Sequence, residues 1–230
     1  MVQAPRPAEV FPSLANPSPG SAPLFPAEEA VWAVLNPDHA MALRRQVSEA
    51  IEAGAGFVPS HEGRGYTVDE SQGRVAVHQT ATIEPGAHLV GPCLIGPNAA
   101  VRHAAYVRSW TWACEGSVIG HATEVKHSVL LPGAKAPHFN YVGDSILGPG
   151  VNLGAGVKLS NLRHDGGEVH VWLGEERVGT GLRKFGAVLG DDVQVGCNAV
   201  TNPGCVLGPA SSVDPNATVS GVHLAAQRHR

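Results

Sequence analysis

The sequence repeats an apolar residue every six positions, and this period constrains the fold more than any other feature. Ten consecutive positions spaced by six, from Val77 to Leu131, are all apolar. Nine of the ten residues that follow them by four positions are small or β-branched. A helix cannot keep a period of six on one face, because each turn takes about 3.6 residues. The period therefore predicts short strands stacked into a solenoid, with large apolar residues inside and small residues at the corners.

The repeat continues in two further runs. The second run begins at Leu147 after a break at Pro137, and the third extends from Leu189 to Val219. Glycine (28 residues) and proline (18 residues) make up a fifth of the chain, which favours β-structure rich in turns over a helical bundle. We therefore expect an all-β fold whose solenoid occupies residues 75–222.

The segment 162–186 separates the second run from the third. Val169, Val171 and Leu173 alternate with other residues, and Gly174 follows them directly. This pattern predicts an inserted β-hairpin arm. Such an arm either reaches a neighbouring subunit, covers a site or remains a solvated decoration, and the pattern leaves all three open.

The flanking segments differ in composition from the solenoid. The first 27 residues hold seven prolines, and we expect residues 1–25 to form a disordered tail. A helical arm at residues 26–58 follows, then a linker at residues 59–74. Residues 223–230 are expected to form a C-terminal tail.

Within the arm, two helices are expected. The first covers residues 27–35. Asn36 is a suitable N-cap for the second, which Gly54 ends. These helices are expected to pack against the solenoid.

Charge and composition exclude several function classes. The formal net charge is −4 without a basic stretch, which argues against nucleic-acid binding. No apolar run approaches the roughly 18–20 residues that span a membrane, and the first 27 residues lack the apolar core of a signal peptide. The four cysteines form no CxxC pair. We therefore expect a reduced, cytoplasmic protein.

Polar residues gather where the repeat changes phase, in the segment 135–161. These residues are His138, Asn140, Tyr141, Asp144, Asn152 and Asn161. Solenoid repeats are themselves structural, so chemistry is expected from outward residues and from breaks in the pattern. By composition alone, His138 is more typical of a turn histidine that bonds the backbone.

The order of these residues resembles a known family. An HxxYxGD stretch at residues 138–144 is followed by NxGAG at 152–156 and then by Asn161. This arrangement is similar to the acetyltransferase domain of the bifunctional sugar-1-phosphate nucleotidylyltransferase/glucosamine-1-phosphate N-acetyltransferases, which are hexapeptide-repeat acyltransferases. The resemblance implies a left-handed parallel β-helix of about six coils. It also implies a homotrimer whose sites lie between subunits.

The resemblance further implies an activity and a set of roles. His138 corresponds to a general base for the transfer of an acetyl group from acetyl-CoA to the amine of an amino-sugar 1-phosphate, of the glucosamine-1-phosphate or galactosamine-1-phosphate type. The residues that correspond to the sugar site are Tyr141, Asn152 and Asn161. Lys126 and Lys184 correspond to phosphate-binding lysines.

An arginine partner for the phosphate is chosen by spacing. Arg108 lies eighteen residues before Lys126, which is one full coil in the implied fold, so both side chains are expected on the same face. Arg102 lies 24 residues before Lys126 and is expected on the adjacent face.

For acetyl-CoA, the resemblance points to Ala155, Cys197 and Pro215. Cys197 replaces a hydroxyl residue of the family, and Pro215 lacks an N–H donor. No tightly bound metal is expected. The chain also lacks the family's nucleotidyltransferase domain, so we expect no uridylyl transfer.

Two alternatives remain. The first is a non-catalytic trimerisation or regulatory module related to nucleotidyltransferases, which the missing domain and the changed Cys197 and Pro215 would suit. The second is a zinc enzyme like the hexapeptide-repeat γ-type carbonic anhydrases, with ligands among His103, His121 and His127.

Trp110 and Trp112 form a pair of tryptophans that should point outward, because Thr111 occupies an inward position. They favour either a subunit contact or packing beneath the N-terminal helices.

Overall fold

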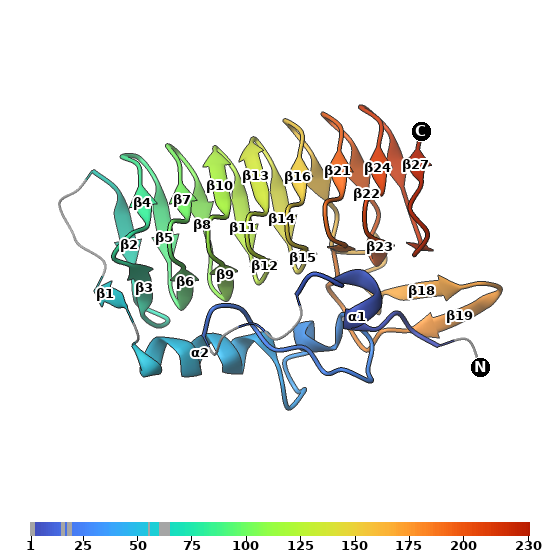
Figure 1. The fold of residues 1–230 in the computed structure, drawn as a ribbon, viewed down its shortest axis with the longest axis horizontal. Coiled ribbons are helices and arrows are strands. Elements are labelled where there is room, and N and C mark those ends of the chain that lie inside the picture. Colours follow the sequence, from blue (N-terminus) through green and yellow to red (C-terminus); the bar gives the residue numbers. More distant parts are fainter. Residues whose placement is uncertain (1–2, 15–16, 18–19, 55, 60–64) are drawn as a thin grey trace.

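The computed structural model describes residues 3–14, 17, 20–54, 56–59 and 65–230. It is a parallel β-solenoid with an N-terminal arm along one side and an inserted hairpin (Figure 1). The chain winds from face A to face C to face B and then returns to face A one coil further on. The left hand of this winding stays a prediction.

Each face is a sheet of parallel strands in the described residues. Face A consists of β3 (Val75–His78), β6 (Cys93–Ile95), β9 (Thr111–Ala113), β12 (Val129–Leu130), β15 (Ile146–Leu147), β20 (Ala187–Leu189), β23 (Cys205–Leu207) and β26 (Val222–His223). Face B consists of β2 (Thr67–Asp69), β5 (His88–Val90), β8 (Tyr106–Val107), β11 (Glu124–Lys126), β14 (Tyr141–Gly143), β17 (Lys158–Leu159), β22 (Val200–Thr201) and β25 (Thr218–Val219). Face C consists of β4 (Thr82–Ile83), β7 (Ala100–Val101), β10 (Val118–His121), β13 (Lys135–His138), β16 (Asn152–Leu153), β21 (Gln194–Val195), β24 (Ser212–Val213) and β27 (Arg228–His229).

The solenoid is therefore longer than the expected six coils, because each face has eight parallel strands within the described residues. At the start, β2 lies in the expected linker and pairs with β5. At the end, β26 and β27 continue the solenoid into the expected C-terminal tail. A further strand, β1 (Phe57–Pro59), pairs with β3 in the antiparallel direction.

The break in the period corresponds to a shorter coil. Val125 pairs with Val107, eighteen residues before it, but also with Val142, only seventeen residues after it. Val107 and Trp112 are five residues apart, whereas their pairing partners Val125 and Val129 are four apart. The corner between face B and face A therefore loses one residue at this point.

The core inside the solenoid follows the predicted period up to this corner. From Leu89 to Val125 the six-spaced residues are buried in the interior cluster. At the corner the prediction fails for Leu131 alone, because Leu130 points into the solenoid and Leu131 packs in a second cluster outside face A. The second run from Leu147 and the third run from Leu189 again place their apolar residues in the interior cluster, as predicted. The missing corner residue is the reason for this change of phase.

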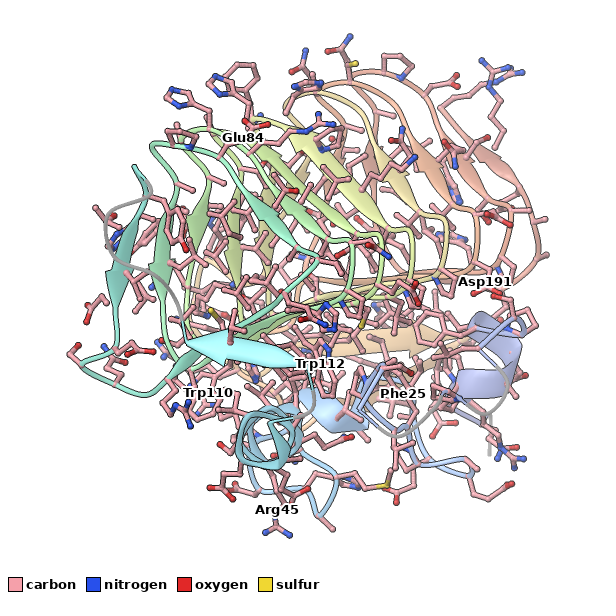
Figure 2. The ribbon with its side chains drawn as sticks, turned by 60° about the vertical axis from the view of Figure 1, so that its left-hand side comes forward. Phe25, Arg45, Glu84, Trp110, Trp112 and Asp191 are labelled. Carbon is pink, nitrogen blue, oxygen red and sulfur yellow. The ribbon has the colours of Figure 1, made fainter. Side chains whose placement is uncertain are left out.

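The N-terminal arm covers the outer side of face A (Figures 1 and 2). Its elements are α1 (Pro7–Val10), the 3₁₀ helix η1 (Ala33–Leu35) and α2 (Leu43–Ala53). The expected first helix is reduced to η1, and α2 begins after Ala42 rather than Asn36. Gly54 ends α2 in the left-handed conformation at φ 66°, as predicted.

The expectation of a disordered N-terminal tail is wrong for its described residues. Val10 in α1 is fully buried, and its carbonyl accepts a hydrogen bond of 3.1 Å from the backbone N–H of Asp191. The Asp191 carboxylate in turn accepts one of 2.7 Å from the backbone N–H of Ser13. A proline-rich composition therefore does not prevent order here, because the solenoid supplies the apolar surface and hydrogen-bond partners that the segment lacks alone.

The tryptophan pair packs beneath the arm, and this excludes a fully exposed pair. Trp112 is only 3% exposed and belongs to the cluster between face A and the arm. Arg44 of α2 places its guanidinium carbon 5.7 Å from the centre of the Trp110 ring. Figure 2 shows both tryptophans on the side of the solenoid that meets the arm.

The predicted hairpin is present as β18 (His170–Leu173) and β19 (Glu176–Gly179), which pair in the antiparallel direction. Val169 and Val171 are buried in the cluster outside face A, and a Cβ on Gly204 would lie about 3 Å from both valines. Trp172 points away and is 56% exposed. The hairpin therefore packs on its own solenoid beside the arm (Figure 1).

Candidate functional site

Register between the coils places equivalent residues in rows that run along the solenoid, spaced by about 4.8 Å. One such row follows the corner between face C and face B, and we call it the corner row. Backbone hydrogen bonds between successive coils define the row. The carbonyl of one member accepts a hydrogen bond from the N–H one residue beyond the next member; for example, the His138 carbonyl accepts from Gly156, which directly follows Ala155. Its members are His103, His121, His138, Ala155, Cys197 and Pro215.

The corner row joins the predicted base to all three residues predicted for acetyl-CoA. His138 and Ala155 lie on successive coils, since the His138 carbonyl accepts from Gly156 N at 2.9 Å. Cys197, a free thiol, and Pro215 follow on the next two coils, and both are exposed. A ligand lying along this row would contact all four residues.

The side chain of Asn140 links the backbone at His138 to the next coil by hydrogen bonds. The Asn140 Oδ1 atom accepts a hydrogen bond of 3.0 Å from the His138 backbone N–H. Its Nδ2 group donates to the Gly154 carbonyl at 2.8 Å, and the side chain is buried. Asn140 thus holds the corner in place while the His138 ring is exposed to solvent.

Around the corner, on face B, several polar side chains meet at Asp144. Its Oδ2 atom accepts hydrogen bonds from Lys126 Nζ at 2.8 Å and from Asn161 Nδ2. Its Oδ1 atom lies 2.9 Å from His127 Nδ1. Asn161 also donates to the hydroxyl oxygen of Tyr141 at 3.2 Å. We call these five residues the Asp144 cluster.

Arg108 lies beside this cluster and is held from two sides. Its Nη1 atom donates to Glu124 Oε1 at 2.8 Å, and its guanidinium carbon lies 5.8 Å from the centre of the Tyr106 ring. The backbone N–H of Arg108 donates to the Val125 carbonyl, so Arg108 and Lys126 occupy equivalent positions on successive coils. The spacing of eighteen residues thus places Arg108 and Lys126 on the same face, as expected, and the phosphate-binding role of Arg108 stays a prediction.

Charges and burial shift three pKa values in this region. Burial on its own raises the pKa of Asp144, but the hydrogen bonds from His127 and Lys126 outweigh it and leave the pKa below its ordinary value. Burial and the nearby Asp144 carboxylate raise the pKa of Tyr141. The hydrogen bond to Glu124 raises the pKa of Arg108. The Asp144 cluster thus presents an ionised Asp144 and a neutral Tyr141 hydroxyl at neutral pH, with the charged Arg108 beside it.

Asn152 and Lys184 lie at the margins of this arrangement. Asn152 opens β16 on face C and pairs in register with Lys135, so within one chain it lies on a different face from Tyr141 and Asn161. Lys184 is exposed and forms an isolated bridge with Leu162. The excursion from the solenoid closes at Asn161, whose carbonyl accepts from the Phe185 N–H at 2.9 Å. Lys184 therefore lies close in the chain to this closure.

Sequence reasoning noticed Asp144 but assigned it no role, and it did not select Glu124 or His127 for the sugar site. The available signal was spacing, because Asp144 follows Lys126 by eighteen residues and His127 by seventeen. Glu124 precedes Lys126 by two residues and therefore points to the same side of the strand. The carboxylate partners of both predicted phosphate-binding cations could have been found by this rule.

The histidines considered for zinc do not converge. His103 and His121 stack in the corner row with ring centres 5.5 Å apart, whereas His127 is buried against Asp144. Within the described ranges, no group of three or more His, Cys, Asp or Glu side chains could hold a metal ion. Nor is any described helix long and apolar enough to cross a membrane.

Comparison with known proteins finds one family model and several curated relatives. Residues 89–202 match the family model described as the GMPPB C-terminal domain. A bifunctional sugar-1-phosphate nucleotidylyltransferase/acetyltransferase from Sulfurisphaera tokodaii is 38% identical over 149 residues, which are 65% of this chain and 37% of that protein. The bifunctional protein GlmU of Methanococcus aeolicus is 34% identical over 149 residues, or 65% of this chain and 36% of that protein.

Among solved structures, the acetyltransferase domain of PglB from Neisseria gonorrhoeae FA1090 aligns with 91% of this chain and 78% of its own at 13% identity. Its TM-score of 0.27 is too low to support an inference. The chain spans little more than a third of the length of the curated relatives named above. Over its solenoid, this chain is similar to the acetyltransferase β-helix domain of the bifunctional sugar-1-phosphate nucleotidylyltransferase/acetyltransferases.

Proposed function

We propose that this chain transfers the acetyl group of acetyl-CoA to the amine of an amino-sugar 1-phosphate, of the glucosamine-1-phosphate or galactosamine-1-phosphate type. The observation that carries the proposal is the corner row. It aligns His138 with Ala155, Cys197 and Pro215 although a 42-residue step separates Ala155 from Cys197. A thioester held along this row would have its acyl end beside His138.

The proposed chemistry is a direct attack. The neutral amine nitrogen attacks the carbonyl carbon of the thioester, and the C–S bond breaks after the new C–N bond has formed. His138 accepts the proton that the amine loses and returns it to the departing sulfur. The backbone N–H of Ala155 is the donor that we propose for the oxyanion between these two steps.

The Asp144 cluster supports the acceptor half of the proposal. In this proposal, Lys126 of the cluster and the neighbouring Arg108 bind the phosphate, while Tyr141 and Asn161 of the cluster bind the sugar. Lys126 has three N–H groups and the Arg108 guanidinium has five, so each retains donors beyond the bond to its carboxylate. Lys184 would supply a further charge from the base of the hairpin.

A shared site between copies would explain the position of Asn152. Face A is covered by the arm, whereas Asn152 on face C and Asn161 on face B lie on different sides of one chain. A homotrimer in which face C of one copy meets face B of another would bring Asn152 to the Asp144 cluster. This supports the proposed trimer.

The test is release of free thiol from acetyl-CoA in the presence of glucosamine-1-phosphate or galactosamine-1-phosphate. We expect turnover by the wild type and a loss of at least about a hundredfold in His138→Ala, because general-base catalysis contributes at least that factor. His103→Ala is the matched control, since His103 is an exposed histidine of the same row two coils away. Full activity of His138→Ala would contradict the proposed role.

A non-catalytic assembly module is the second candidate. It is favoured by the ion pairs of both predicted phosphate-binding cations, Arg108 with Glu124 and Lys126 with Asp144. A trimer that binds no acetyl-CoA in calorimetry and shows no turnover with either acceptor would support the module instead.

A further inference from the structure

We propose that Asp144 is a positioning residue that orients Lys126 and Asn161 toward the acceptor's phosphate and sugar. This inference rests on the proposed function and concerns the same site. It assigns a role to a carboxylate that touches neither the corner row nor the proposed reacting atoms.

The two carboxylate oxygens of Asp144 hold different partners. Oδ1 is held by His127 Nδ1 at 2.9 Å. Oδ2 accepts from both Lys126 Nζ and Asn161 Nδ2. His127 therefore fixes the rotation of the carboxylate, and the carboxylate fixes an ammonium and an amide that come from two different coils.

Burial strengthens the hydrogen bonds of Asp144, because it shields them from water. Asp144 is 4% exposed and His127 is 5% exposed, so little water competes for their hydrogen bonds. A Cβ on the neighbouring Gly143 would lie 2.6 Å from the Tyr141 hydroxyl and 2.7 Å from Asn161 Nδ2. Glycine at this position thus leaves the space in which the side chains of Tyr141 and Asn161 meet.

The corner itself does not require a carboxylate. Trp110, His127 and Asp144 occupy equivalent positions on three successive coils, and all three adopt the left-handed conformation, with φ of 67°, 44° and 48°. A tryptophan and a histidine therefore make the same turn. Because burial of a carboxylate is costly unless it is paired, the presence of Asp144 here favours a role in holding its partners.

The orientation of the partners follows from these contacts. Lys126 is about four-fifths buried, and its ammonium would otherwise rotate freely on a four-carbon chain. With one N–H directed to Asp144, its two other N–H groups have restricted directions. Asn161 donates from Nδ2 to Asp144 and Tyr141, which leaves its carbonyl oxygen to accept from a sugar hydroxyl.

The test variant is Asp144→Asn, because asparagine has the same size and tolerates the left-handed conformation. The measurements are kcat, the KM for glucosamine-1-phosphate, the KM for acetyl-CoA, and the affinity for inorganic phosphate by calorimetry. We expect the acceptor KM and the phosphate Kd to rise by about tenfold or more, because hydrogen bonds to charged groups are among the stronger ones. The KM for acetyl-CoA is expected to stay unchanged.

Two further variants separate positioning from folding. His127→Asn, which also tolerates the turn, is expected to raise the acceptor KM by less than Asp144→Asn, because His127 acts only through Asp144. Asp191→Asn is the matched control: Asp191 is also a buried carboxylate, but it holds Ser13 of the arm. It is expected to lower stability without changing either KM.

The outcomes are distinguishable. An Asp144→Asn protein that melts at a lower temperature with an unchanged acceptor KM and phosphate Kd would overturn the proposal, and so would tighter phosphate binding. If the wild type binds phosphate but acetylates no acceptor, the proposed function fails, and the change in phosphate affinity alone decides the role of Asp144. A wild type that binds neither glucosamine-1-phosphate, galactosamine-1-phosphate nor phosphate overturns both.

Discussion

At the scale of single residues, the predicted site depends on carboxylates as much as on Lys126 and Arg108, the cations proposed to bind phosphate. Lys126 and Arg108 each have a carboxylate partner, Asp144 and Glu124 respectively, within 2.8 Å. These partners neutralise charge in the free protein and restrict the directions of the cations. The Lys126–Asp144 pair is the more buried of the two, so removal of its carboxylate should have the larger effect on structure.

The lowered pKa of Asp144 predicts a dependence of stability on acid. In the unfolded chain its pKa returns to about 3.9. The ionised carboxylate therefore stabilises the folded state above about pH 4, and this contribution is lost as the pH falls through the lower pKa of the folded state. Asp144→Asn removes the contribution at every pH.

We therefore expect the free energy of unfolding of the wild type to fall more steeply below about pH 4 than that of Asp144→Asn. Urea denaturation at about pH 6, 4 and 3 measures both proteins. Parallel curves for the two proteins would show that Asp144 has the same pKa in both states, contrary to the expectation.

At the scale of elements, the arm and the hairpin act as a second layer on face A. Apolar residues of α2 and η1 contact the outward side chains of face A, and Val169 and Val171 of the hairpin segment join the same cluster. The outward residues of this face are therefore a second core. Most predicted site residues lie on faces B and C or at the corner between them, whereas Lys184 directly precedes Phe185 of the second core.

A substitution of Trp112 tests whether this second core stabilises the fold. We expect Trp112→Ala to lower the free energy of unfolding by about 3–5 kcal/mol, the usual cost of deleting a buried aromatic side chain. Trp172→Ala is the control, since Trp172 is largely exposed at the hairpin and should change stability by less than about 0.5 kcal/mol. Chemical denaturation followed by circular dichroism measures both variants. Equal effects of the two substitutions would contradict the assignment of face A as a packed layer.

At the scale of the whole molecule, the proposed sites require more than one copy. Asn152 lies on face C of one chain and Asn161 follows β17 of face B, and in the described residues the arm packs on face A. We expect light scattering to give three times the chain mass of 23.8 kDa. A monomer that remains fully active would show that one chain carries the complete site and would remove Asn152 from it.

The sequence alone determined the solenoid, the interior positions of all three runs of the period apart from Leu131, the position of the hairpin and the resemblance carried by residues 138–161. These features are local, because a strict period of six assigns each residue to a strand or a corner without knowledge of distant segments.

Only the tertiary structure decided where the coil shortens. That one-residue loss places Leu130 rather than Leu131 inside, and it stacks His127 on Asp144. The alignment of Ala155 with Cys197 was likewise decided by the fold, because it depends on where the chain leaves and rejoins the solenoid around the hairpin. The order of the N-terminal segment also depends on contacts that its own composition does not encode, such as the hydrogen bond from Asp191 to Val10.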